Sequence, residues 1–431
     1  MTAAGEEEDD GDGLDLDDLD RPEDSLAQRL QPVPRLTCLG SPQLEIHSEV
    51  TPEFMRRYEL KPNIDVKIEE PHWRMLGELV ETASSTDSGL EYAVGGSAGS
   101  TARAVRALHR ANERGLMHGE RDETLEVMLL GSVGKDEMSK RLQEICALDG
   151  LGVLFSETDE VLTGWRAVLR TSEPQGANGL GPPPGADPLD HDVAVQVPRH
   201  VASATSHGAG REYKLDHLRF KVWQHIEATS IVYVDAHFLT VSSESVRIVA
   251  EHCAKTGKLF CLNLSAQYLC SFFRELILQV VPYTDYIFGN EMEYLGLLGD
   301  KAGRGCELDD ALDWLVKIPR ADGNETKRRR VVATNGSKPC VVASTWKGYG
   351  VMVQRFPVPP LRTGRFVTGN GAGDAFAGGF LYGLMREADL ESCVELALFA
   401  AHSAVQRGRQ RFQFKDRPTV KPAVAKAKAP A

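Results

Sequence analysis

The sequence has no apolar run approaching the roughly 18 residues that a membrane-spanning helix needs. Its eight cysteines are scattered between Cys38 and Cys393 and form no C-x-x-C pair. This spacing argues against a zinc site and against a disulfide framework, and it is typical of a reducing compartment. The first residues are acidic, unlike the basic start of a signal peptide. We therefore expect a cytoplasmic protein with no membrane partner.

Negative charge exceeds positive charge, with 62 Asp and Glu against 49 Lys and Arg and a formal net charge of −13. Most of the excess lies in residues 1–24, which hold twelve acidic residues and one arginine. The remainder is nearly neutral, so we expect no nucleic-acid partner. One basic run, Lys327–Arg330, lies beside an apolar strand. We interpret it as a solvated edge, with a nuclear address as the alternative.

Three segments have compositions that favour disorder over a packed core. Residues 1–30 are acidic, residues 415–431 are rich in Lys, Ala and Pro, and residues 171–192 are rich in Gly and Pro. We predict that the first two are disordered tails and that the third is a flexible insertion. A single globular domain is then expected over residues 31–414.

Apolar strand-like runs alternate with helical ones between the tails. Strands are predicted at Leu125–Val133, Ser230–Val241, Leu259–Ala266, Asp285–Asn290 and Arg330–Gly336, and helices at Asp136–Ala147, Ser242–Gly257, Ser271–Pro282 and Asp374–Arg386. Repeated units of this kind predict an α/β fold with a central, mostly parallel sheet covered by helices. Strand-like residues near 43–70 and 160–200 lie outside this alternation and suggest a small β lid.

The stretch Val367–Leu384 reads VTGNGAGDAFAGGFLYGL and places alternating glycines before an apolar helix. A loop that opens a helix in this way presents backbone N–H groups to an anion. Asp374 at its edge could accept a proton from a hydroxyl that attacks phosphorus, while the amides stabilise the developing charge. Asp374 could equally be a plain helix cap. The spacing leaves both interpretations open.

No Walker loop is present. Gly134 and Lys135 follow a strand, but the earlier glycine of that motif is missing and Asp136 replaces its Ser or Thr. Any nucleotide phosphates would therefore be held by backbone amides rather than by a P-loop lysine.

Several stretches resemble the ribokinase-like (PfkB) family of carbohydrate and nucleoside kinases, and within it the adenosine kinases. The matching stretches, in chain order, are YELKPN, GGSAG, HFLTVSSESV, LNLSAQYLCSFFRELILQVVPYTDYIFGNEMEY, ATNG and GNGAGDAFAGGFL, spread over roughly residues 36–412. The resemblance implies a ribokinase-like fold and transfer of the ATP γ-phosphoryl group to the 5′-hydroxyl of adenosine, which gives AMP. It also implies ATP as co-substrate, Mg²⁺ as cofactor and a monomeric enzyme of purine salvage.

The resemblance assigns a role to each matching position. Asp374 would be the general base. The amides of the anion hole would come from Asn370, Gly371, Ala372 and Gly373, the ATP contacts from Thr334, Asn335 and Gly336, and the phosphate and Mg²⁺ contacts from Asn290, Arg199 and, through water, Glu293. The acceptor contacts would come from Ser41, Glu45, Gly95, Gly96, Ser100 and Phe238.

The acceptor positions depart from the family pattern. Ser41 and Glu45 stand where N-P-x-x-D has Asn and Asp, Ser100 replaces the Asn of G-G-x-x-x-N, and Thr368 replaces the first acid of D-T-x-G-A-G-D. A displacement of about 1 Å can lower a rate roughly 10²-fold. Two alternatives therefore stay open: a family kinase for another nucleoside or sugar, and a non-catalytic nucleotide-binding relative. The intact G-A-G-D with Asp374 speaks against the second.

Overall fold

The computed structural model describes residues 33–61, 65–68, 72–85, 89–113, 125–171, 200–299, 305–323, 327–346, 350–361 and 369–407. Apart from Val33, these residues belong to one compact unit that starts at Pro34. The predicted tails at 1–30 and 415–431 and the insertion after Thr171 lie outside the described residues. So do Arg199 and Thr368.

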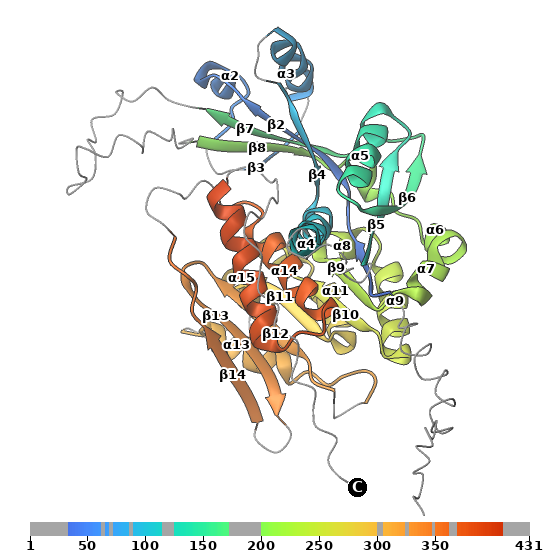
Figure 1. The fold of residues 1–431 in the computed structure, drawn as a ribbon, viewed down its shortest axis with the longest axis vertical. Coiled ribbons are helices and arrows are strands. Elements are labelled where there is room, and N and C mark those ends of the chain that lie inside the picture. The colour runs from blue at the N-terminus through green and yellow to red at the C-terminus, as the bar shows by residue number, and fades with distance from the viewer. Residues whose placement is uncertain are drawn as a thin grey trace, which may run out of the picture. The chain divides into compact units, whose positions relative to one another are not determined.

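A nine-stranded sheet runs through this unit in the order β14-β13-β12-β11-β10-β9-β1-β5-β6 (Figure 1). Its strands are β1 Arg35–Leu39, β5 Glu126–Gly134, β6 Gly152–Thr158, β9 Ile231–Asp235, β10 Leu259–Asn263, β11 Tyr286–Asn290, β12 Arg330–Asn335, β13 Lys338–Trp346 and β14 Gly350–Phe356. All neighbours from β12 to β6 pair in parallel, and β13 and β14 extend the sheet in antiparallel fashion. The predicted central, mostly parallel sheet is confirmed.

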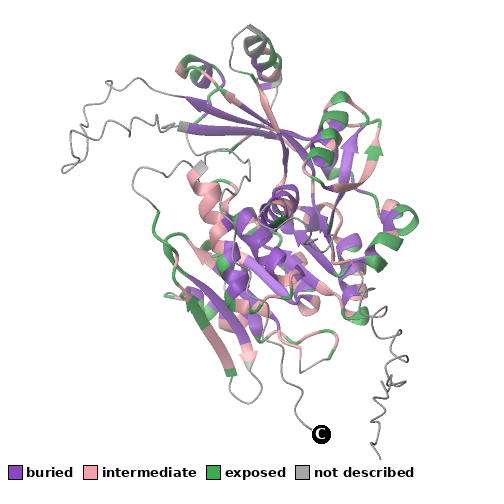
Figure 2. Ribbon diagram, in the orientation of Figure 1, coloured by how far each residue is buried: buried purple, intermediate pink, exposed green. Residues whose placement is uncertain are grey.

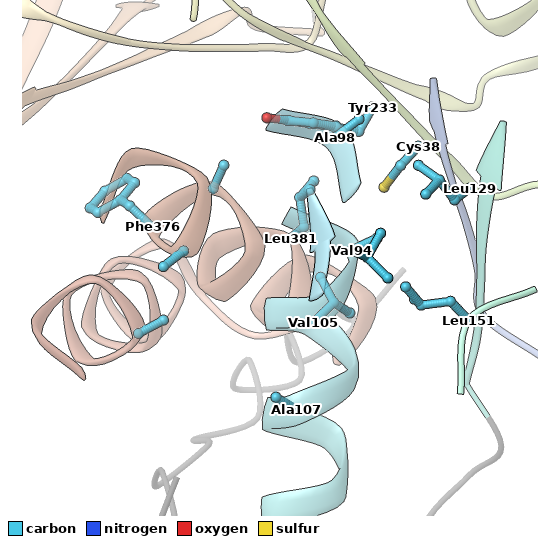
Figure 3. Close-up of a cluster of buried hydrophobic side chains, with 14 of the residues drawn as sticks. Cys38, Val94, Ala98, Val105, Ala107, Leu129, Leu151, Tyr233, Phe376 and Leu381 are labelled. Atoms are coloured by element: carbon cyan, nitrogen blue, oxygen red, sulfur yellow. The ribbon is translucent and has the colours of Figure 1, made fainter. Parts of the chain in front are cut away.

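Helices cover both faces because alternate residues of the central strands point to opposite sides. Tyr233 and Cys261 lie in the core that includes α4 (Ser97–Glu113), α14 (Ala372–Met385) and α15 (Leu390–Arg407). Val234 and Leu262, one residue further along, lie in the second core. Figure 3 shows the first core, with Tyr233 on the sheet side of the labelled side chains of α14 and α4.

The remaining helices are short or lie between the strands. They are α2 Pro52–Arg57, α3 Trp73–Ser85, α5 Glu137–Leu148, α6 Leu215–His217, α7 Trp223–Ala228, α8 Ala236–Val241, α9 Ser243–Thr256, α10 Gln267–Phe272, α11 Arg274–Val280, α12 Glu291–Leu298 and α13 Leu308–Val316. None of the helices in the described ranges has the length and apolar character to cross a bilayer.

Two sequence predictions of secondary structure were wrong. The strand expected over Ser230–Val241 ends at Asp235, whose carboxylate accepts the Phe238 N–H at 2.8 Å and so starts helix α8. The helix expected over Ser271–Pro282 is two helices, α10 and α11, which meet at Phe273. In both cases apolar residues continue on either side of the break, so hydrophobicity does not mark where the backbone changes direction.

A second sheet of five strands has the order β3-β8-β7-β2-β4. Its strands are β2 Gln43–Glu49, β3 Asp65–Lys67, β4 Glu91–Gly95, β7 Trp165–Thr171 and β8 His200–Ser206. Four of them fall in or at the edge of the ranges for which a lid was predicted, and β4 was not foreseen. That this sheet closes over a nucleoside stays a prediction.

The second sheet has two unlike faces. Leu44, Ile46, Ala167 and Leu169 belong to the hydrophobic core on one side. On the other side lie Glu45 and Arg166, which pair across β2 and β7 and are polar, together with the apolar Val168. Both faces are largely buried, as the purple strands β2, β7 and β8 of Figure 2 show.

The basic run Lys327–Arg330 is not a solvated edge. Arg329 is only 2% exposed. Its guanidinium donates to the Thr284 hydroxyl at 2.9 Å and to the carbonyls of Val281 and Ile318 at 2.7 and 2.6 Å. Lys327 forms an ion pair with Asp285 at 2.9 Å. The run therefore fixes helix ends and loops against β12 from within the fold.

Replacing Arg329 by Met should destabilise the protein by about 3 kcal/mol or more, because three buried acceptors lose their donor. Urea unfolding monitored by circular dichroism measures this change. Arg56→Met is the matched control, since Arg56 forms a surface pair with Glu53 in which both side chains are more than two-thirds exposed. A surface pair contributes about 0–1 kcal/mol. Equal losses in the two variants would contradict the structural role of Arg329.

Candidate active site

One pocket lies at the carboxyl ends of the central strands and at the start of α14. It is lined by Asn263, Ser265, Phe288, Gly289, Asn290, Glu293, Val332, Thr334, Gly373, Asp374 and Phe376. In parallel α/β sheets, ligands bind at this edge, where loops and helix N-termini converge. The structure thus brings together five of the predicted site residues, namely Asn290, Glu293, Thr334, Gly373 and Asp374.

The glycine loop turns directly into helix α14. Gly371 precedes the helix with φ +77°, a left-handed conformation that glycine adopts without strain. The first N–H groups of any helix lack partners within it, so they are free to bind an anion. Of the four predicted anion-hole amides, that of Ala372 already donates to the Gly369 carbonyl at 3.2 Å. Gly373 is exposed at the pocket, where its missing side chain leaves open space.

Asp374 sits in the first turn of α14, and its carboxyl group titrates unusually. Burial raises its pKa to about 7, with the negative charges of Asp235 and Glu45 adding to the rise. A hydrogen bond from the Ser97 hydroxyl to Asp374 Oδ1, at 2.6 Å, and the positive charge of Arg166 act in the opposite direction. A carboxylate with this pKa can take up a proton near neutral pH. Ser97 lies within the GGSAG stretch, but its contact with Asp374 was not predicted.

Asp235 is a second buried carboxylate that the sequence analysis missed. It ends β9, and it caps two helices at once, accepting the Phe238 N–H at 2.8 Å and the Ala98 N–H at 3.0 Å. Burial raises its pKa above the ordinary range. Because Ala98 lies beside Ser97 at the start of α4, Asp235 fixes the residue that contacts Asp374.

Asn290 and Glu293 form a capping box at the start of α12. The Glu293 N–H donates to Asn290 Oδ1 at 3.0 Å, and the Glu293 carboxylate accepts the backbone N–H and the side-chain amide of Asn290 at 3.0 and 2.7 Å. Burial raises the pKa of Glu293 to about 7. Both carboxylate oxygens face the Asn290 donors, yet the side chain still lines the pocket.

The side chains that line this pocket can be compared with the ligands that Mg²⁺ prefers. Mg²⁺ prefers oxygen ligands and usually keeps several waters while it binds one or two carboxylates and substrate phosphates. Across the described ranges, no three His, Cys, Asp or Glu side chains come together as a metal-binding group. Glu293 offers carboxylate oxygens at the pocket without such a cage. The residues therefore fit a hydrated ion held through water.

The three residues predicted to bind ATP face different spaces. Thr334 lines the pocket with Asp374. Asn335 pairs with Lys338 across the β12–β13 turn that contains Gly336, and it lines a separate pocket with Glu291 and Lys338. The strand end brings Thr334 to the reaction pocket, whereas the side chain of the next residue points to the other face.

The residues that were predicted to contact the acceptor lie close together, around the start of β2 and the start of α4. Gly96 has φ +80°, and a Cβ there would lie 2.4 Å from the Ser41 carbonyl oxygen, so only glycine fits. Ser41 donates to the Gly210 carbonyl at 2.9 Å. Gly95 packs against Glu45, and Ser100 is buried on α4.

Phe238 is not placed to stack on a base. It is 0% exposed and packs against Tyr213, with ring centroids 5.1 Å apart. Its neighbour His237 lines a second pocket instead, together with Ser41, His207, Arg211, Thr240, Val241, Tyr268, Leu269 and Phe273. This segment was expected to be a strand, and the helix that replaces it rotates Phe238 into the core.

Comparisons with known proteins agree with this geometry. The profile of the pfkB family carbohydrate kinases matches residues 199–416. The chain is similar to adenosine kinase 2 of Arabidopsis thaliana, with 30% identity over 376 residues that cover 86% of this chain and 94% of that relative. It is 29% identical to the adenosine kinase of Saccharomyces cerevisiae, with the same coverage.

Solved structures show the same fold. The crystal structure of Anopheles gambiae adenosine kinase in complex with P1,P4-di(adenosine-5) tetraphosphate superposes with a TM-score of 0.68. The identity is 27%, and the match covers 90% of this chain and 99% of that one.

Removing the Ser97 hydroxyl should raise the pKa of Asp374 further above about 7, because the hydroxyl donates to the charged form. A hydrogen bond to a charged group is worth about 1.5–3 kcal/mol, so we expect a rise of about one unit or more in Ser97→Ala. Carboxyl-carbon NMR titration measures it, with the signal assigned through Asp374→Asn. Ser271→Ala, on α10, is the control and should leave the titration unchanged. An unshifted pKa in Ser97→Ala would refute the contact.

Proposed function

The chain belongs to the pfkB family of carbohydrate kinases, and we propose that it transfers the γ-phosphoryl group of ATP to the 5′-hydroxyl of adenosine, giving AMP and ADP. One observation gives the strongest support to this phosphoryl transfer. Asp374, with a pKa of about 7, shares a pocket with the amide end of α14 and with Asn290, Glu293 and Thr334. A base, an anion site and phosphate-side groups therefore meet in one place.

Asp374 acts as the general base of this reaction. As the 5′-oxygen bonds to the γ-phosphorus, its proton moves to the Asp374 carboxylate, and the bond to the β–γ bridging oxygen breaks to release ADP. Negative charge spreads over the transferring oxygens, and the N–H groups at the start of α14, Gly373 among them, stabilise it. The carboxylate and the amides thus serve different atoms of the same step.

The residues on the phosphate side bind ATP and orient it. Glu293 and Asn290 would hold hydrated Mg²⁺, which when bound neutralises phosphate charge. Thr334 would contact ATP at the end of β12, and Asn335 and Gly336 would border the nucleotide at the following turn. Arg199 would contact the transferred phosphate, although it lies outside the described residues.

We place this enzyme in the cytoplasm as a monomer. All eight cysteines are free, and seven are buried, which supports a reducing compartment. Burial raises the pKa of Cys146 and Cys340 to about 12, so these thiols stay protonated and unreactive.

Replacing Asp374 by Asn should lower kcat about 10²- to 10⁴-fold, because the base is lost, and leave ATP affinity nearly unchanged. AMP formation from adenosine and Mg-ATP measures the first, and equilibrium titration with an ATP analogue the second. Asp313→Asn on the surface of α13 is the control and should keep full activity. A near-normal rate in Asp374→Asn would exclude the base assignment.

The same variant should also be no less stable than the parent at pH 8. The folded-state pKa of Asp374 lies above its unfolded value, so its favourable contribution exists below about pH 4 and is lost as the pH rises through 7. At pH 8 the ionised carboxylate therefore destabilises the folded state, and replacement by Asn removes this destabilisation. A lower thermal midpoint in the variant would show that the fold itself needs this carboxylate.

The pH dependence of kcat/KM should show an acid limb near pH 7. The base must be ionised to accept a proton, so the rate rises with pH through the Asp374 pKa and then levels off. Initial rates from pH 5.5 to 9 at constant ionic strength measure it. An acid limb near pH 4 would mean that a different carboxylate, or an unshifted one, controls the reaction.

A further inference from the structure

The polar face of the second sheet is an unusual surface to bury. Seven of its residues are Gln43, Glu45, His47, Asp65, Arg166, Ser203 and Thr205, brought together by the register of β2, β3, β7 and β8, and Val168 and Arg170 of β7 lie on the same face. Five of the seven are less than 7% exposed. Buried polar groups destabilise a fold unless they are hydrogen-bonded, so each of them should have an identifiable partner or another purpose.

Most of this face is paired within itself. Asp65 accepts the hydroxyls of Ser203 and Thr205 at 2.7 and 2.9 Å. Glu45 Oε2 pairs with His47 Nε2 at 3.1 Å. Although burial alone would raise the pKa of Glu45, the His47 contact and the charge of Arg166 hold it below the ordinary value, so this carboxylate is ionised.

Arg166 is the exception. It lies on β7, directly between Glu45 of β2 and Thr205 of β8. Its Nη2 donates to the Ser203 hydroxyl at 3.0 Å, but Nη1 is 3.6 Å from Glu45 Oε1 and Nε is 3.8 Å from Asp65 Oδ1. Among the described residues, Nε has no hydrogen-bond acceptor.

A purely structural arginine in such a place would be held tightly by both carboxylates, because an incompletely paired buried cation is strongly unfavourable. Arg166 instead keeps a loose geometry, and its side chain is still 23% exposed. Nε itself is buried, so the donor capacity left for another molecule lies at Nη1, which is 3.6 Å from Glu45 Oε1.

Arg166 also lies on the acceptor side of the reaction. Glu45, whose Oε1 is 3.6 Å from Arg166 Nη1, packs against Gly95. Two residues further along the chain, the Ser97 hydroxyl donates to Asp374 at 2.6 Å, so a short series of contacts connects Arg166 with the proposed base. The groups expected on the ATP side, Asn290 and Thr334, come instead from the strands β11 and β12. An acceptor whose hydroxyl meets Asp374 would thus present the rest of its sugar toward Arg166.

The residues that the sequence offered for the sugar are poorly placed for it. Ser100 is short and buried, and Glu45 is 1% exposed and paired with His47. A guanidinium presents a planar fork of N–H donors that matches two neighbouring oxygen atoms. Two adjacent hydroxyls of a ribose supply such a pair.

Building on the proposed function, we propose that Arg166 is the residue that selects the sugar of the acceptor, by donating to the vicinal 2′- and 3′-hydroxyl oxygens of a ribonucleoside beside Glu45. The acceptor class is accordingly a nucleoside with an intact ribose diol. Arg166 binds and discriminates, and it takes no part in proton transfer.

Steady-state kinetics of Arg166→Gln with adenosine, 2′-deoxyadenosine and 3′-deoxyadenosine tests this. The variant should raise the KM for adenosine about tenfold or more while kcat changes little. It should raise the KM for at least one deoxy analogue much less, because the contacted hydroxyl is already missing. The preference of the parent enzyme for adenosine should therefore collapse.

Two controls separate this outcome from simple damage to the fold. The thermal midpoint and the affinity for an ATP analogue report whether the variant is intact. Arg106→Lys, a half-buried arginine of α4 that donates to the Leu125 carbonyl, should leave the ratio of adenosine to deoxyadenosine unchanged. An equal KM increase for all three nucleosides in Arg166→Gln, or no increase, would overturn the proposal.

Calorimetric binding of the three nucleosides distinguishes a failure of this proposal from a failure of the proposed function. Should the parent protein bind adenosine more tightly than the deoxy analogues, and lose that preference in Arg166→Gln, the role of Arg166 stands even without turnover. Should the parent show no preference for the ribose diol, Arg166 is not the selecting residue, whatever the rate of AMP formation.

Discussion

The two hydrogen bonds accepted by Asp235 hold the reacting side of the site in register. One comes from the start of α8 and the other from the start of α4, at 2.8 and 3.0 Å. The second places Ser97 so that its hydroxyl meets Asp374 across more than 270 residues of chain. A carboxylate at the end of a central strand thus positions Asp374, the proposed base, through Ala98 and Ser97. Without it, two helix N-termini would be left with unpaired N–H groups in a buried place.

This arrangement concentrates negative charge. Asp235 and Glu293 are buried and Asp374 is partly buried, and burial raises the pKa of each. Each lies at the start of a helix, whose positive end partly offsets the charge. The offset is incomplete, since Asp374 and Glu293 still titrate near pH 7. A cationic ligand would relieve the remaining repulsion, so binding of a cation at this edge would stabilise the protein.

Some elements could be predicted because their signal is local. Glu126–Gly134 and Tyr286–Asn290 are continuous apolar runs bounded by polar residues, and the helix Ser243–Thr256 has a clear amphipathic period. The loop before Asp374 was recognisable because glycines at this fixed spacing are typical of a loop that opens a helix. The turn at Asp235 could not be recognised from the sequence, because apolar residues continue on both sides of it. Phe238 was misplaced for the same reason, since a strand and a helix would point its side chain in different directions.

Other features depend on residues that meet only in three dimensions. Nothing near Arg329 in the sequence shows that Val281 and Ile318 will supply its acceptors. The polar face of the second sheet likewise joins residues from four separate strands, and its pairing sets which side chains are satisfied. The interpretation of Lys327–Arg330 as a solvated edge was wrong. A charged side chain is expected to be exposed only where the fold offers it no buried hydrogen-bond acceptors.

The division of labour between the two sheets explains how an altered acceptor side can coexist with intact phosphoryl-transfer machinery. The base, the amides and the capping box all belong to the large sheet and its helices, whose alternating apolar strands fix their positions from both faces. The second sheet is anchored by one apolar face, through Leu44, Ile46 and Leu169, and that face alone determines its register. Its other face can therefore exchange one polar residue for another without moving a strand. Glu45 and Arg166 lie on that face, outside the elements that position Asp374, so substitutions there would change the contacts offered to an acceptor and leave the proposed base in place.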